Sequence, residues 1–174
     1  MEHPLITAVT HSTEEARITL LGVPDRPGAA ASIFRALADA NCNVDLIIQN
    51  EPLGEGRQAE VSFTVASEDR ADAERALEAL KADMGIGSIE TDPAIGKVSI
   101  VGAGMRSHPG VAANVFRTLA DEDINIEMIS TSPIKISCVI RSDDVPRAVR
   151  ALVDAFELTD AEVQAERPIG QEAR

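Results

Sequence analysis

A turn containing Pro-Gly, followed by an amphipathic helix, occurs twice in this sequence, and the chemistry it offers is binding of a carboxylate. The two turns begin at Pro27 and Pro109. A helix N-terminus presents unpaired backbone N–H groups and a partial positive charge, and both stabilise an anion. Glycine at this point lets a ligand approach the backbone closely. The simpler alternative is that Pro and Gly only shape the start of each helix, as they do in many proteins.

Polar residues near the end of the following strand in each copy would complete such a site. Gln49 and Asn50 come after the first of these strands, and Ser-Thr-Ser at 130–132 comes after the second. Their amides and hydroxyls would face the helix N-terminus, while Asp25 or backbone carbonyls would accept hydrogen bonds from an ammonium group. Together these residues predict binding of a zwitterion, such as a free amino acid.

The two turns belong to a larger internal repeat. When Pro27–Leu46 is aligned with Pro109–Met128, ten of twenty positions are identical. Upstream, Ile18–Gly22 aligns with Val98–Gly102 at an offset of eighty residues. Solenoid repeats have periods of roughly 20–50 residues, so a period near eighty indicates a duplicated domain instead.

Hydrophobic periodicity predicts the order βαββαβ in each copy. The expected strands of the first copy are 18–23, 43–49, 59–65 and 88–91. Those of the second copy are 98–103, 125–129, 134–140 and 161–165. A helix is expected between the first and second strands and between the third and fourth. Such a unit is α+β and ferredoxin-like, with an antiparallel sheet that carries both helices on one face.

The repeat also suggests where the domains begin and end. We expect the first domain at 15–92 and the second at 93–166. An additional apolar strand at 4–10 precedes the first copy and is expected to join the sheet of the second domain. The polar segment 167–174 is expected to be a frayed tail.

Composition excludes several classes of partner. With 16 Lys and Arg against 29 Asp and Glu, the net charge of the 174-residue chain is −13, which repels nucleic acid and anionic membranes. Aromatic residues make up 2%, so stacking platforms for single-stranded nucleic acid are lacking. The sequence contains neither an 18-residue apolar run nor a signal-peptide pattern. We therefore expect a cytoplasmic protein that binds neither nucleic acid nor membranes.

Residue patterns typical of catalysis or metal binding are missing from the sequence. It contains no Walker loop, no GxSxG and no HExxH, and its three histidines lack metal-ligand spacing. Cys42 and Cys138 do not form a CxxC pair, and both are expected to be small buried thiols. We expect no catalytic residue, no metal and no cofactor in this chain.

The two copies resemble the tandem ACT domains of aspartate kinases. The most specific stretch is GKVSIVGAGMRSHPGVAANVF, followed by NIEMISTS, and the first copy reads GVPDRPGAAASIFRALADANCNVDLIIQN. The resemblance covers residues 6–163 and is strongest to the small regulatory (β) subunit. It implies that the chain lacks the catalytic domain for ATP-dependent phosphorylation of L-aspartate, and that its partners are a catalytic (α) chain and a second copy of itself.

The resemblance also implies feedback inhibition and two effector pockets where ACT domains of two chains meet. L-threonine is the expected effector and L-lysine is a second candidate, alone or together with threonine, in a pathway that leads to lysine, threonine and methionine. The first pocket would use Asp25, Gly28, Ala29, Ala30 and Gln49, with Asn125 and Ile126 of the other chain. The second would use Met105, His108, Gly110, Val111, Ala112 and Ser132, with Asn43 and Val44 of the other chain.

Ala112 departs from the family pattern, because related chains often carry a hydroxylated residue there. The second pocket is therefore expected to bind threonine weakly or to prefer another amino acid. The alternative function is a stand-alone ACT module that regulates a different enzyme or a transcription factor. An enzyme on the same scaffold, such as an acyl-phosphate hydrolase, would need an Arg and Asn beside a phosphate loop, and the sequence has none.

Overall fold

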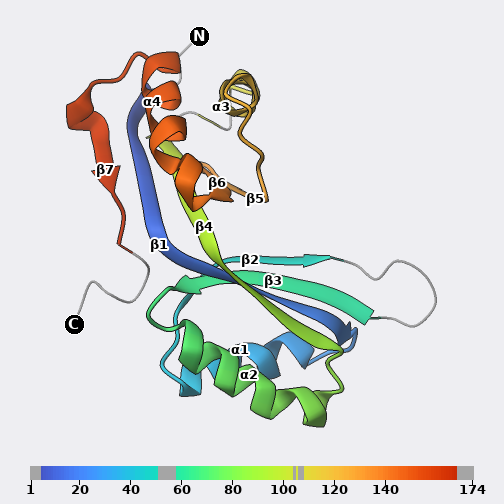
Figure 1. Cartoon of the computed structure of the whole chain (residues 1–174). Helices are drawn as coiled ribbons and strands as arrows, with labels where there is room; N and C mark the ends of the chain where they lie inside the picture. Colours follow the sequence, from blue (N-terminus) through green and yellow to red (C-terminus); the bar gives the residue numbers. More distant parts are fainter. Residues whose placement is uncertain (1–4, 51–57, 104, 106–107, 168–174) are drawn as a thin grey trace. The chain divides into compact units, whose positions relative to one another are not determined.

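The computed structural model describes residues 5–50, 58–103, 105 and 108–167, and its α+β fold confirms the predicted class (Figure 1). The strands are β1 (Leu5–Pro24), β2 (Val44–Asn50), β3 (Gln58–Ala66), β4 (Ser88–Ala103), β5 (Met128–Ser132), β6 (Lys135–Arg141) and β7 (Val163–Ala165). The helices are α1 (Ala29–Asp39), α2 (Arg70–Met84), α3 (Gly110–Asp121) and α4 (Val145–Ala155), with short 3-10 turns η2 (Ser142–Asp144) and η3 (Asp160–Glu162). The expected tail at 167–174 lies, apart from Arg167, outside the described residues.

Two compact units make up the chain. The middle unit is built on Glu14–Pro93, and the split unit combines Met1–Thr13 with Ala94–Glu166. In each unit two helices lie side by side on one face of the sheet: α1 and α2 in the middle unit, α3 and α4 in the split unit (Figure 1).

The middle unit has the strand order β2–β3–β1–β4. Its core fills the space between this sheet and helices α1 and α2, with Ile18, Ile33, Leu37 and Phe63 fully buried. The split unit has the corresponding order β5–β6–β4–β1, and β7 adds to β1 in parallel. A ferredoxin-like sheet therefore forms twice, each time with sequence-distant strands hydrogen-bonded to one another.

β1 and β4 are each one continuous strand, whereas the sequence predicts two separate segments in each. The predicted strand 4–10, from residue 5 onward, and the predicted strand 18–23 both lie in β1, and 88–91 and 98–103 both lie in β4. Each long strand supplies one half to the middle unit and the other half to the split unit. The residues between the two segments stay extended because the segments on both sides of them are hydrogen-bonded to neighbouring strands, so the sequence needs no turn residue there.

Three local predictions need correction. Gln49 lies inside β2, as in the expected strand 43–49, but Asn50 also lies inside β2, and Ser130–Ser132 lie inside β5 rather than following it. Ile134 lies in the turn before β6 and is 60% exposed, so it does not continue the buried alternation of that strand. Cross-strand pairing explains the difference, because both β2 and β5 extend along partners that sequence periodicity does not reveal.

The duplication is visible in atomic detail where each first helix ends. Asn41 and Asp123 both have left-handed backbone conformations, with φ of 57° and 56°. The next residue in each copy donates its N–H to a leucine carbonyl five residues earlier, at 2.9 Å: Cys42 to Leu37 and Ile124 to Leu119. This is the 6→1 bond of a Schellman turn, and Asn and Asp are the non-glycine residues that tolerate it best.

Both cysteines are buried, and we expect them to be unreactive in the folded chain. Burial raises the pKa of the Cys138 thiol to about 12, and Cys42 is 5% exposed. Because the thiolate is the nucleophile, Ellman's reagent at pH 8 should modify neither thiol in the native chain and both after denaturation. Rapid stoichiometric labelling of the native chain would contradict this prediction.

Candidate functional site

The starts of α1 and α3 are the two positions at which the sequence predicts binding of a carboxylate. Gly28 precedes α1 with φ of 92°, a left-handed conformation that favours glycine, and Pro109 precedes α3. Neither helix start has a side-chain cap. The Ala29 and Val111 N–H groups donate to the carbonyls of Arg26 and His108, each at 3.2 Å. An anionic ligand would therefore bind the other backbone N–H groups in the first turn of each helix.

In the split unit, the start of α3 borders a pocket of about 360 Å³. It is lined by Met105, His108, Pro109, Ala112, Thr131, Ser132, Pro133 and Ile136. These residues come from the turn before α3, the first turn of α3, and the β5–β6 hairpin. The volume lies at the lower end of the range of small-molecule sites, which is roughly 300–1,000 Å³.

The pocket combines apolar walls with a few polar groups. Met105 and Ile136 are buried side chains that form apolar surface, and Ala112 contributes a small half-buried methyl group from α3. Thr131 and Ser132 contribute polar, exposed side chains to the lining from β5. Such a lining suits a small molecule that has one anionic group for the helix N-terminus and a short, partly apolar side chain.

Four residues predicted for the second pocket line this cavity: Met105, His108, Ala112 and Ser132. Gly110 is the exposed first residue of α3, and Val111 is 6% exposed and belongs to the core beneath it. Sequence reasoning placed Pro109 and Thr131 near the helix start but left them out of this pocket, and it missed Pro133 and Ile136. The Pro-Gly turn and the Ser-Thr-Ser run were the available signals for the first two, whereas Ile136 was assigned only to the core.

The residues predicted for the first pocket lie in the equivalent part of the middle unit. Asp25, Gly28 and Ala30 are exposed at the turn and at the start of α1. Ala29 is 8% exposed and packs in the core, and Gln49 is exposed near the end of β2. Residues 51–57, which follow β2, lie outside the described part of the chain.

The residues predicted to complete each pocket from another chain lie between the first helix and the next strand of each unit. Asn43 is exposed and Val44 begins β2. Asn125 is exposed in the loop before β5, and Ile126 packs against the core of the split unit. The two asparagines therefore have side chains that are accessible to another molecule.

Each unit has an edge strand that carries an exposed isoleucine. β2 and β5 are the last strands of their units, and Ile47 and Ile129 are 51% and 43% exposed on them. The repeat alignment places these two residues at equivalent positions. An edge strand has unpaired backbone groups, so an exposed apolar side chain on it indicates a surface suited to pairing.

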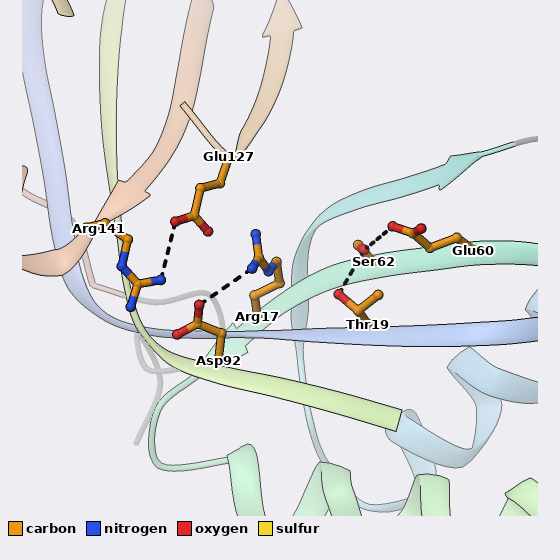
Figure 2. A network of polar contacts seen from close by, with 7 residues as sticks. All are labelled: Arg17, Thr19, Glu60, Ser62, Asp92, Glu127 and Arg141. Atoms are coloured by element: carbon orange, nitrogen blue, oxygen red, sulfur yellow. Dashed lines mark hydrogen bonds and ion pairs between the residues drawn. The ribbon is translucent and has the colours of Figure 1, made fainter. Parts of the chain in front are cut away.

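On the face of each sheet away from the helices, polar side chains interact with one another. Thr19 and Ser62 hydroxyls are 3.0 Å apart, and the Arg17 guanidinium lies 3.5 Å from the Asp92 carboxylate (Figure 2). In the split unit the equivalent hydroxyl pair is Ser99 and Ser137, 2.8 Å apart. Its edge carries the ion pair Arg141–Glu127 at 3.3 Å (Figure 2).

In these polar contacts, hydroxyls pair with hydroxyls and cations pair with carboxylates, as cross-strand neighbours commonly do. None of them places a nucleophile beside a general base. Among the described residues, no group of three His, Cys, Asp or Glu side chains could hold a metal ion. No helix in the described part of the chain is long and apolar enough to cross a membrane.

Comparison with known proteins identifies the repeated units. The ACT domain family matches residues 17–83 and, through a second ACT domain profile, residues 98–156. Aspartokinase from Mycolicibacterium smegmatis is 45% identical over 158 residues, which cover 91% of this chain and 38% of that protein. The chain thus spans about two fifths of the length of the curated relatives it matches.

Two solved structures match nearly from end to end. A chain from the crystal structure of aspartokinase alpha and beta subunits is 46% identical, with a TM-score of 0.81, and 88% of this chain covers 100% of it. The ligand-free regulatory subunit of aspartate kinase from Thermus thermophilus is 40% identical, with a TM-score of 0.80, and 87% of this chain covers 98% of it. The chain therefore belongs to the aspartate kinase family, in which it corresponds to the regulatory region of two ACT domains.

Proposed function

We propose that this chain is a regulatory subunit of aspartate kinase that binds a free amino acid and transmits feedback inhibition. L-threonine is the proposed effector, with L-lysine as the alternative. The observation that carries the proposal is the pocket at the start of α3, where an uncapped helix N-terminus meets two hydroxyls and a small apolar cavity. The effector carboxylate would bind the helix N-terminus, and its side chain would contact the apolar wall.

Two pockets are proposed at each interface between an ACT domain of one chain and an ACT domain of another, and each pocket is completed by the other chain. Edge strands β2 and β5, with exposed Ile47 and Ile129, support pairing of ACT domains side by side between chains. In such a pair, Asn125 and Ile126 would close the first pocket, at Asp25–Ala30 and Gln49. Asn43 and Val44 would close the second, at Met105–Ala112 and Ser132. The exposed positions of both asparagines are compatible with this role.

We place the first ACT domain at 15–92 and the second at 93–166, with 4–10 as a strand of the second. The two compact units, Glu14–Pro93 and Met1–Thr13 with Ala94–Glu166, support these boundaries. The proposed partners are a catalytic chain of aspartate kinase and a second copy of this chain, in the cytoplasm. Inhibition would follow from a higher affinity of the effector for the arrangement of the regulatory dimer that is linked to a less active kinase.

Titration calorimetry of the full chain tests the proposal, first with L-threonine and then with L-lysine. Saturable binding of one of them is expected. Ala112→Leu should weaken that binding at least tenfold if the α3 pocket is used, because the larger side chain fills the cavity. Ala113→Leu is the matched control, since Ala113 is the next residue of α3, is exposed and does not line the pocket. Equal affinity in the two variants would remove this pocket from the proposal.

The first pocket and the cross-chain arrangement have separate tests. Gln49→Ala and Asn125→Ala should each reduce the number of bound effectors or their affinity. Sedimentation with and without threonine should show a tighter dimer when the effector is bound. If neither amino acid binds, or if dimerisation is equally strong in both conditions, the proposed sensor mechanism is wrong.

A further inference from the structure

Glu166 lies at the centre of a cluster of charged and hydroxyl side chains in the split unit, remote in sequence from its partners. Lys97 Nζ is 3.4 Å from Glu166 Oε2, and Lys135 Nζ donates a hydrogen bond to Glu166 Oε1. Thr10 Oγ1 donates to the same oxygen at 2.6 Å. The three donors come from β4, β6 and β1, so one carboxylate joins three strands of the sheet.

Two of the three donor groups are largely removed from water, whereas the Lys135 side chain is 33% exposed. Lys97 is 4% exposed and Thr10 is 6% exposed, whereas lysine is almost never fully buried unless it is paired. The Glu166 side chain is itself only 21% exposed. A buried ammonium needs a negative partner, because leaving one member of a buried ion pair without the other is strongly destabilising.

The backbone carries Glu166 to this position through a short parallel strand. β7 pairs with β1 in the register Val9–Val163, Thr10–Gln164 and His11–Ala165. The Glu166 N–H then donates to the His11 carbonyl at 2.7 Å. Since β7 has only three residues, its backbone pairing alone is a weak attachment, and the side chain of Glu166 adds contacts with three further strand residues.

The electrostatics agree with a bound carboxylate. Burial opposes ionisation of Glu166 and is the largest single influence, but it is outweighed by hydrogen bonds from Lys135 and Thr10 and by the charges of Lys97 and Lys135. The pKa of Glu166 is consequently held below its ordinary value of 4.5. The charged groups that face it are Lys97 on β4 and Lys135 on β6, and His11 on β1 contributes its backbone oxygen.

We propose that Lys97, Lys135 and Thr10 form a carboxylate-binding site that the chain fills with its own Glu166, and that this contact latches the C-terminal strand onto the N-terminal strand. The latch covers the outer edge of β1 with β7, which protects that edge from pairing with other chains. It also ties together the two ends of the split unit, 5–13 and 163–166.

The latch is attached to the hairpin that lines the α3 pocket. Lys135 pairs with Ser132 across the β5–β6 hairpin, and Ile136 is the next residue along β6. Ser132 and Ile136 both line the cavity. Closing the latch therefore restrains the β5–β6 hairpin from the other face of the sheet. This restraint is independent of any effector, so its test does not depend on the proposed regulatory function.

Chemical rescue tests the latch on the full chain. Glu166→Ala should lower the Tm by about 3–6 °C, because it leaves Lys97 without this carboxylate. Sodium acetate should restore part of the loss in a saturable manner, whereas sodium chloride at the same ionic strength should not. The restoration should disappear in the double variant Glu166→Ala with Lys135→Met. Glu122→Ala removes an exposed carboxylate at the end of α3 and is the matched control, expected to leave the Tm unchanged.

A milder variant and a second readout keep the latch testable if Glu166→Ala folds poorly. In Glu166→Gln, hydrogen exchange of the amides of Val9–His11 should be at least tenfold faster than in the unaltered chain. The stability that Glu166 contributes is present above its unfolded-state pKa and is lost as pH falls through its lower folded-state pKa, so the two chains should converge in stability in acid. A Tm equal to that of the Glu122→Ala control, unchanged exchange at β1, or equal effects of acetate and chloride would overturn the latch.

Discussion

Replacing Phe63 with alanine is expected to lower the free energy of unfolding by about 3–5 kcal/mol, the usual cost of removing a fully buried aromatic side chain. Phe63 is 0% exposed in the centre of β3 and belongs to the core of the middle unit. Its ring meets the ring of Phe34 edge-on, with centroids 5.5 Å apart and an interplanar angle of 66°. The chain has only four Phe and no Tyr or Trp. The neighbours of Phe63 are therefore mostly aliphatic, and they cannot fill the space that the lost ring leaves.

Urea denaturation followed by circular dichroism would measure this loss. Phe63→Leu keeps most of the buried volume and should cost less than about 1.5 kcal/mol. Arg35→Ala removes a side chain that is 77% exposed and forms an ion pair with Asp39 on the surface of α1, and it should change stability by less than about 0.5 kcal/mol. If Phe63→Ala behaved like Arg35→Ala, the assignment of Phe63 to the core would be wrong.

Gly96→Ala is the second substitution for which we expect a large loss, at the upper end of about 1–3 kcal/mol. A methyl group at this position would overlap Val145 Cγ2 and would lie 2.9 Å from the Ser12 carbonyl oxygen. The backbone oxygen cannot move without breaking the ladder, and Val145 is a buried residue at the start of α4. The glycine is therefore required for close packing of α4 and η2 on β4, not for an unusual backbone angle.

Gly110→Ala is the matched control in the same unit. A methyl group at Gly110 meets no atom within 4 Å, and the residue begins α3, where alanine is a better helix former than glycine. We expect this variant to be as stable as the unaltered chain or more stable, as measured by thermal unfolding. Comparable losses in the two variants would show that glycine flexibility, rather than packing, explains Gly96.

Local pattern was sufficient to predict the elements that recur. The helix-face residues Ile33 and Leu37 in the first copy, and Val115 and Leu119 in the second, are buried as their spacing predicts. This succeeds because helical periodicity depends on residues three and four apart, which the sequence displays directly. The repeat also located both helix starts, although the turns differ in detail: Gly28 is left-handed and precedes α1, whereas Gly110 is the first residue of α3.

Only some of the residues that line the candidate pocket could be predicted from the sequence. Met105, His108, Ala112 and Ser132 could be carried over from a family motif, and all four line the cavity. Ile136 and Pro133 could not, because they reach the pocket only through the β5–β6 hairpin and its register. Register depends on which strands pair, and strand pairing is a property of the whole sheet.

By itself, the sequence determined that this protein is a duplicated βαββαβ chain with a Pro-Gly turn before the first helix of each repeat. Only the tertiary structure decided that Leu5–Thr13 and Val163–Ala165 meet at one edge of the split unit, that Gly96 must lack a side chain, and that Glu166 is held by Lys97 and Lys135. Each of these features joins residues that are between 31 and 156 positions apart or packs a helix against a distant strand. Contacts over such separations leave no periodic trace in the sequence, because they are fixed by the packing of complete elements and not by neighbours along the chain.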